Sequence, residues 1–279
     1  MPPTKPCGTH LLLRCLLVTL LASLAGIPID GRSADAEPAS DTTPAATETE
    51  RTTTDEAWPA DPPAAVNRHG IRRIAIIPPA SPVVYELHNV SALAFVIPLS
   101  GTLNHLDSKE KSKLFGEKLK PLDASRARTF ARNVADDLDR LGYHARILED
   151  VARDPEDPDA VDYERLATSA DAVLHLRFST VGLYSSRTST QYVPRVNASG
   201  VLVVKGQEDY LYDREIYYGA DARAGKSWAI VADEQYAYPT FEAVMSNLDA
   251  IRGAFDAASR AIGQRLASQV DEAINAPPE

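Results

Sequence analysis

The sequence predicts an α/β fold of the α+β kind, in which a mixed sheet with an antiparallel three-stranded meander is covered by helices. Residues 172–179 alternate apolar and polar side chains with the period of a half-buried strand. A valine-rich run at 196–205 and a tyrosine-rich run at 211–218 add two further strands. Residues 240–275 keep apolar side chains at helical spacing throughout, which indicates a long C-terminal amphipathic helix.

The links between the three strands of the meander are short and polar. Residues 185–191 read SSRTSTQ, and 205–209 read KGQED with Gly206 available for a positive φ. A parallel crossover needs about a dozen residues or more, so links of this length predict antiparallel neighbours.

Before the meander the sequence predicts a strand at 71–79, a helix at 123–141, a strand at 143–148 and a short helix at 162–169. The first strand is a branched apolar run that two prolines stop. Gly142 follows the long helix where a left-handed cap is favoured. The apolar face of that helix is formed by Phe130, Val134, Leu138 and Leu141.

The amino terminus, residues 1–36, has the pattern of a secretory signal peptide. Lys5 and Arg14 provide the positive charge, and the apolar run at 16–25 is too short to span a membrane comfortably. Residues 34–36 read Ala-Asp-Ala and fit a small-x-small cleavage site, with 23–25 as the competing site. The pattern therefore predicts export across the inner membrane, into the periplasm if the chain is bacterial.

Residues 37–68 predict a disordered acidic linker, and residues 69–279 a single α/β domain. The linker contains seven threonines, five prolines and a charge of −5. Cys7 and Cys15 both lie in the signal peptide, so the mature chain has no disulfide, thiol nucleophile or cysteine zinc site. Arg14 directly before Cys15 does not fit the lipoprotein motif. The net charge of −10 argues against nucleic acid as a partner.

An insertion at 81–121 separates the first strand from the first long helix. Its segment 91–99 is nearly all apolar, whereas residues 109–113 read KEKSK. Two interpretations stay open: the insertion packs on the domain's own core, or residues 90–99 form a flap that contacts a partner or a membrane surface. The candidate partner-binding residues are Ala92, Leu93, Phe95, Val96 and Ile97.

The chain contains no G-x-G-x-x-G, Walker, H-E-x-x-H or G-x-S-x-G motif, and no cofactor or metal site is indicated. One strand face carries His175, Arg177 and Ser179, and either Tyr212 or Arg214 is expected across from His175. The candidate ligand face consists of His175, Arg177, Ser179 and Tyr212. The alternative is that this polar face is solvated or covered by a loop. A site residue should line a pocket, and a structural one should be packed or hydrogen-bonded.

The order of these elements resembles the envelope domains of the curli-secretion lipoprotein family and the amino-terminal domain of the Tol-system propeller protein. The matching pieces are IAIIPP at 74–79, LGYHARIL at 141–148 and ADAVLHLRF at 170–178. The resemblance implies a periplasmic binding or assembly domain without an active site. The chain departs from it in its 81–121 insertion and in lacking the lipoprotein cysteine.

The function expected from these observations is that of an exported, non-enzymatic interaction module in cell-envelope assembly or maintenance, with an envelope protein as partner. The alternative is a periplasmic small-ligand binder or hydrolase that uses the strand face around His175. The oligomeric state stays open.

Overall fold

The structure is a computed structural model. The expected signal peptide and the five candidate residues of the 91–99 segment lie outside the residues that it describes. The described residues are 58, 67, 69–81, 83–89, 100–120, 124–186, 191–207 and 209–277.

One mixed sheet organises the described chain, which confirms the predicted fold class. The strand order is β3-β1-β4-β5-β6-β7, and β2 pairs with β4 outside that path. The pairs β1–β3, β1–β4, β2–β4 and β6–β7 are parallel, while β4, β5 and β6 are antiparallel. The strands are β1 (Arg73–Ile77), β2 (Glu86–Asn89), β3 (His144–Ile147), β4 (Ala172–Ser185), β5 (Tyr192–Val204), β6 (Tyr210–Gly219) and β7 (Ala229–Ile230).

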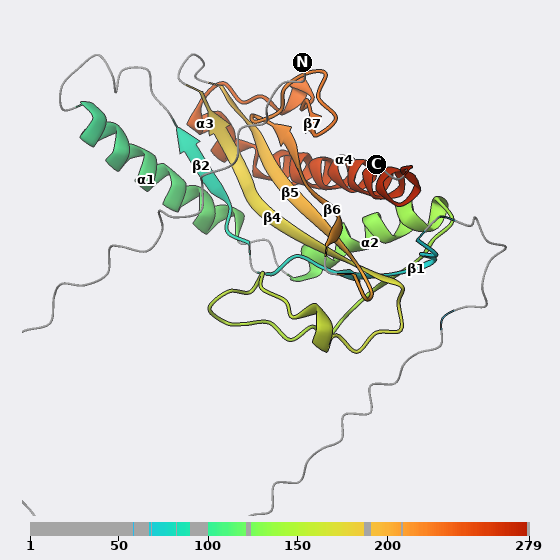
Figure 1. The fold of residues 1–279 in the computed structure, drawn as a ribbon. Coiled ribbons are helices and arrows are strands. Elements are labelled where there is room, and N and C mark those ends of the chain that lie inside the picture. Colours follow the sequence, from blue (N-terminus) through green and yellow to red (C-terminus); the bar gives the residue numbers. More distant parts are fainter. Residues whose placement is uncertain are drawn as a thin grey trace, which may run out of the picture. The chain divides into compact units, whose positions relative to one another are not determined.

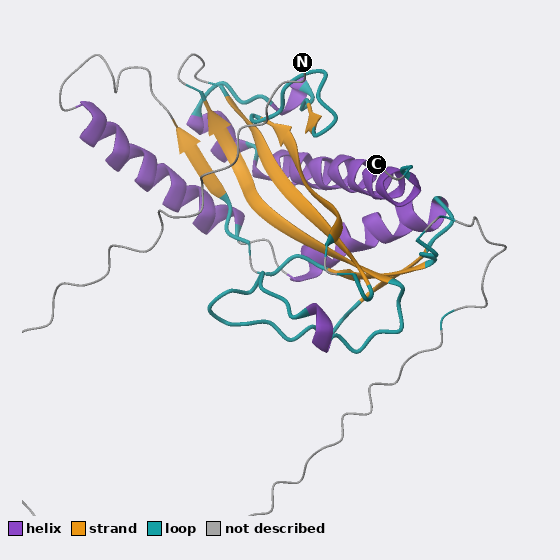
Figure 2. Ribbon diagram, viewed as in Figure 1, coloured by secondary structure: helices purple, strands orange, loops and turns teal. Residues whose placement is uncertain are grey.

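The predicted meander is present as β4, β5 and β6 (Figure 2). The turn between β5 and β6 uses Gly206 at a φ of 80°, as expected from the sequence. The apolar-polar alternation of β4 holds until a β-bulge between Phe178 and Thr180. The bulge adds a residue to the strand, so the faces shift by one position after it.

Helices α2 (Ala124–Arg140) and α4 (Leu248–Asn275) pack against one face of the sheet (Figure 1). Phe130, Val134 and Leu138 are buried there, as their spacing predicts. Leu141 was expected on the same face but is 45% exposed, because the helix ends at Arg140 and Gly142 turns the chain at a φ of 95°.

The single helix expected at 240–275 is two helices, α3 (Phe241–Ser246) and α4, so that prediction was wrong in one respect. Thr240 caps α3 through its Oγ1, which accepts the N–H of Ala243 at 3.2 Å. At Asn247 the backbone leaves helical geometry, and the side chain Nδ2 donates to the carbonyl of Ala243 at 2.7 Å. Asparagine competes with the backbone for hydrogen bonds in this way, which interrupts the helix.

The described part of the insertion, β2 and α1 (Ser100–Leu119), contributes to the core on the helix-covered face. Leu87, Phe115 and Leu119 are buried, and Tyr85 stacks on Phe255 of α4 with ring centroids 5.0 Å apart. These residues therefore agree with the first interpretation, in which the insertion packs on the domain's own core. The alternative for residues 90–99 remains a prediction.

The opposite face of the sheet is covered at β1 and β4 by residues 148–170, which we call the strap. The strap encloses a second, small apolar cluster. The short helix expected at 162–169 is reduced to a 3₁₀ turn, η2 (Tyr163–Arg165), capped by Asp162. The buried members of this cluster are Ala75, Ile77, Ala170 and Val173, against which Trp58, Leu148, Val151, Val161, Tyr163 and Leu166 are packed.

Two residues of the expected linker contact the folded domain. Trp58 donates from Nε1 to Ser169 Oγ at 3.1 Å and lies under the guanidinium of Arg146, 4.8 Å from the ring centroid. The Asn67 side chain is hydrogen-bonded to both the N–H and the carbonyl of Ile71. Ordered contacts thus begin before residue 69.

Asp171 joins the starts of β1 and β4. Its Oδ2 accepts the backbone N–H groups of Arg72 and Arg73 at 2.9 and 2.8 Å, and its Oδ1 accepts the Arg73 guanidinium at 2.8 Å. Burial raises the pKa of this carboxyl, but the bonds from Arg73 and from the two backbone groups outweigh burial and lower it.

Asp171→Ala should lower the free energy of unfolding by about 2 kcal/mol at neutral pH, because it leaves two backbone donors without their charged acceptor. Urea unfolding measures this change, and Asp150→Ala, at an exposed carboxylate, is the matched control. Since the folded-state pKa is depressed, the contribution is present above the unfolded pKa of about 3.9 and is lost as pH falls below it. Equal stability of the two variants at pH 7 would contradict this role.

Candidate functional site

The second face of the sheet is polar where the strap ends, and it is hollowed over β5, β6 and the chain leading to β7. We call this hollow the β5–β7 depression; its volume is about 800 Å³. Register places Asn197, Glu215 and Tyr217 on the strap side of the sheet, because Asn197 and Tyr217 pair across from Thr180, while Ala198 and Ile216 are buried under the helices. Arg214 alternates with Glu215 along β6 and pairs with Gly200, so it lines the depression from the helix-covered side. The depression is therefore formed mainly by the face that no described helix covers, and Arg214 lies at its edge.

Asp221 organises one end of the depression. Its Oδ2 accepts Arg195 Nε at 2.6 Å and Asn197 Nδ2 at 2.7 Å. A carboxylate only accepts hydrogen bonds, so it fixes the orientation of the Asn197 amide. Gly219, at a φ of 83°, turns the chain so that Ala220 N–H reaches the Pro194 carbonyl at 2.9 Å and Asp221 faces β5.

Glu215 organises the centre. It accepts a hydrogen bond from Ser179 Oγ and another from the Tyr217 hydroxyl at 2.6 Å. The bond to Glu215 raises the pKa of Tyr217, with smaller contributions from burial and from the charges of Glu215 and Asp221, so the phenol stays neutral. Trp228 meets the Tyr217 ring edge-on, with centroids 5.2 Å apart. These contacts hold the aromatic rings and the carboxylate in one arrangement.

Three guanidinium groups line the depression, and they differ in whether a carboxylate is paired with them. Arg195 is paired with Asp221, but Arg214 and Arg223 are exposed and make no ion pair with any residue that the structure describes. Free guanidinium groups beside an aromatic ring favour anionic groups, because they offer planar, two-pronged donation to a carboxylate or phosphate. The arrangement is suited to binding an anionic group.

His175 does not line this depression. It is fully buried under the strap, and its Nδ1 is 3.0 Å from the hydroxyl of Tyr163, while Nε2 has no partner among the described residues. Burial, together with the smaller effects of the charges of Arg177 and Arg153, lowers the pKa of His175 to about 4. The ring is thus neutral, packed and bonded, which is the geometry of a structural histidine.

The structure does not bring the four candidate residues together. Tyr212 is paired with Leu202 and is buried under α4, where its hydroxyl donates to Gln269 Oε1 at 2.9 Å. It therefore lies on the opposite face from His175, so its expected place across from that ring was wrong. Asp213 takes that register position instead, across Val201. Of the four, only Ser179 contacts a residue of the β5–β7 depression, through Glu215.

Sequence reasoning missed Arg195, Asn197 and Asp221. A signal for the first two was present, because polar residues alternate with apolar ones along β5 from Arg195 to Ser199. The sequence contains no such signal for Asp221, because the position of this residue depends on the turn at Gly219.

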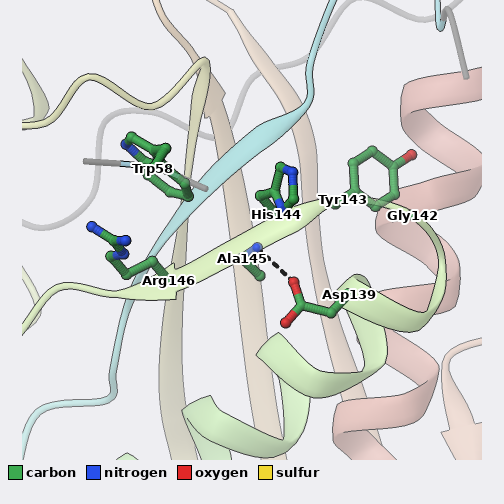
Figure 3. Close-up of a pocket in the computed structure, with 7 residues that line it drawn as sticks. All are labelled: Trp58, Asp139, Gly142, Tyr143, His144, Ala145 and Arg146. Carbon is green, nitrogen blue, oxygen red and sulfur yellow. Dashed lines mark hydrogen bonds between the residues drawn. The ribbon is translucent and has the colours of Figure 1, made fainter. Parts of the chain in front are cut away.

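A smaller hollow of about 320 Å³ lies at the edge strand β3 (Figure 3). Figure 3 shows Asp139 reaching the strand, where its Oδ1 accepts the Ala145 N–H at 2.8 Å. This bond occupies an outward donor of an edge strand, which protects the edge from pairing with another chain. His144 and Trp58 also line this hollow. We assign it a structural role.

No protein-family model matches the sequence, and no curated protein matches it. Among solved structures, the chain is similar to a Xanthomonas campestris protein of the DUF330 family, with 6% identity, a TM-score of 0.34 and coverage of 72% of this chain and 88% of the other. A hypothetical protein from Chlamydia trachomatis has 8% identity, a TM-score of 0.33 and coverage of 74% and 99%. A lipoprotein from Neisseria meningitidis has 14% identity, a TM-score of 0.25 and coverage of 55% and 88%.

Similarity at these TM-scores carries no inference about function. The resemblance to the curli-secretion and Tol-system domains stays a prediction. Within the part of the chain that the structure describes, every helix is too short or too polar to cross a membrane.

Proposed function

We propose that the chain is an exported, non-enzymatic interaction module of the bacterial cell envelope and that it binds an acidic segment of a partner protein at the β5–β7 depression. The observation that carries this proposal is the uneven covering of the sheet. Helices pack on one face and the strap covers part of the other, which leaves the β5–β7 half of that face without a covering element among the described residues.

The charge of the depression supports an acidic partner segment. The chain as a whole has a net charge of −10, so an acidic segment is repelled by most of its surface. Arg214 and Arg223 offer unpaired positive charge at one place, and the Trp228 ring beside them offers an apolar contact. Attraction by these arginines, combined with repulsion by the rest of the surface, would orient an acidic segment and make its binding specific to the depression.

The proposal is tested by site-specific photo-crosslinking in cells. A crosslinking residue at Lys226, on the exposed rim next to Arg223, should capture an envelope protein through an acidic segment that mass spectrometry identifies. The double variant Arg214→Glu, Arg223→Glu should reduce that crosslink at least about tenfold, because it turns attraction into repulsion at two positions. The matched control is Arg260→Glu, an exposed arginine on α4, which should leave the crosslink unchanged.

Two outcomes would count against this site. A crosslink that survives the double variant but disappears when residues 91–99 are deleted would move the contact to the apolar flap expected from the sequence. A captured segment without acidic residues would contradict the proposed partner chemistry. The hydrolase alternative would need His175 to reach a substrate, and His175 is fully buried.

A further inference from the structure

The strap is attached to the sheet by few contacts. Its apolar cluster has four buried members, two of which are alanines, whereas the cluster under the helices contains most of the large side chains of the core. Its polar contacts with the rest of the domain include the contact between Tyr163 and His175, the bond from Arg153 to the Pro78 carbonyl and that from Leu148 N–H to the Ile76 carbonyl. Trp58 also donates to Ser169, and Glu149 forms an ion pair with Arg128 at an exposed position. Segments with such limited burial open at lower free energy than the rest of a domain.

His175 lies where the strap meets the sheet. The ring is fully buried, and one nitrogen faces the Tyr163 hydroxyl while the other has no described partner. Both charged groups that act on the ring are cations, Arg177 on the same strand and Arg153 on the strap. A protonated ring would therefore be a third positive charge in this cluster, buried without a carboxylate bonded to it.

The remaining titratable groups around the strap do not compensate for that charge. Asp159 acts on Arg153, and Tyr210 and Asp213 act on Tyr163, but none of the three is among the groups that shift the His175 ring. Arg177 is itself constrained, because its Nε is buried with no hydrogen-bond partner among the described residues. Lifting the strap hydrates all of these groups at once.

We propose that residues 148–170 form an acid-sensitive strap that closes over the sheet while His175 is neutral and is released when the ring takes up a proton. Release uncovers the apolar cluster of Ala75, Ile77 and Val173 on the second face of the sheet. The core under α2 and α4 lies on the other face and stays packed. The device is independent of the partner proposed for the β5–β7 depression.

The direction of the pH dependence follows from the two states of the ring. The ordinary pKa of a histidine exposed by opening is about 6.5, and burial followed by the two arginine charges lowers the pKa of the closed form to about 4. The open form therefore binds more protons between these values. Closure has its full stability above pH 6.5 and loses it progressively as pH falls toward 4.

Hydrogen exchange of the full chain, corrected for the intrinsic effect of pH, measures strap opening. For one ring with these two pKa values, the opening constant of amides in 160–168 should rise about 70-fold from pH 7.5 to pH 4.5. Amides of α2 and α4 should show no comparable rise. His175→Gln should abolish the rise in the strap, and His88→Gln, at an exposed histidine paired with Glu86, should leave it intact.

An equal rise in His175→Gln, or a rise shared by α2, α4 and the strap, would overturn the proposal, because opening would then be linked to other groups or to global unfolding. If His175→Gln does not fold, His175→Phe and a direct NMR titration of the ring in the unmodified chain replace it. A measured ring pKa at or above 6.5 would overturn the proposal as well.

Discussion

Gly182→Ala is expected to lower the free energy of unfolding by about 3 kcal/mol, at the upper end of what overpacking usually costs. Gly182 lies in β4 directly opposite Glu86 of β2. A Cβ at this position would lie 1.9 Å from the Glu86 carbonyl oxygen and 2.9 Å from its nitrogen. Both atoms belong to the backbone, so no side-chain rotation relieves the clash and β2 must move.

The displacement of β2 should extend to the insertion. Tyr85 and Leu87 flank the clash, and Tyr85 stacks on Phe255 of α4. Urea unfolding gives the change in free energy, and hydrogen exchange shows whether β2 and α1 lose protection before the meander does.

Gly253→Ala is the matched control for Gly182→Ala. This glycine lies in α4, and a Cβ there would meet nothing within 4 Å. Alanine is the better helix former by about 1 kcal/mol, so this variant should be as stable as the parent chain or more stable. If Gly182→Ala were as stable as Gly253→Ala, the parallel β2–β4 pair would not be tightly packed.

The sequence was sufficient to predict the elements whose pattern is local. The alternation in β4, the glycine turn before β6 and the apolar spacing of α2 each depend on neighbours along the chain. The pairing of β2 with β4 was beyond such reasoning, because residues 86–89 read ELHN and show no strand signal of their own. Tertiary contacts with β4 and α1 decide their conformation.

Prediction of the candidate site was limited in the same way, because local patterns do not report tertiary contacts. Alternation correctly placed His175 and Arg177 on one face, but it contains no information on what covers that face. The cover is the strap, whose Tyr163 contacts His175 from 12 positions earlier in the sequence. Tyr212 was misplaced because the face of a residue on another strand depends on register, and a one-residue difference reverses it. The β5–β7 depression also depends on the turn at Gly219.

Phe130→Ala is expected to have the largest effect on stability, a loss of about 3–5 kcal/mol. Phe130 is 1% exposed in the middle of α2, and its ring packs on Phe178 of β4 with centroids 4.9 Å apart. It also approaches Gly263 of α4, where the absence of a side chain lets the two helices come close. Truncation therefore leaves a cavity where α2, α4 and the sheet meet.

The cavity cannot close easily, because each of its walls is held elsewhere. The α2–α4 approach is already tight, since a Cβ at Gly263 would lie 3.3 Å from Val134 Cγ2, and Phe178 is fixed at the bulge of β4. Leu141→Ala removes a 45% exposed side chain that directly follows the end of α2, and it should cost less than about 1 kcal/mol. Urea unfolding of both variants measures the difference. Similar losses would mean that Phe130 is not the packing centre of this layer. A large loss for Phe130→Ala alone would show that stability depends on the helix-covered face. The strap and the β5–β7 depression, on the other face, would then be free to move or to bind.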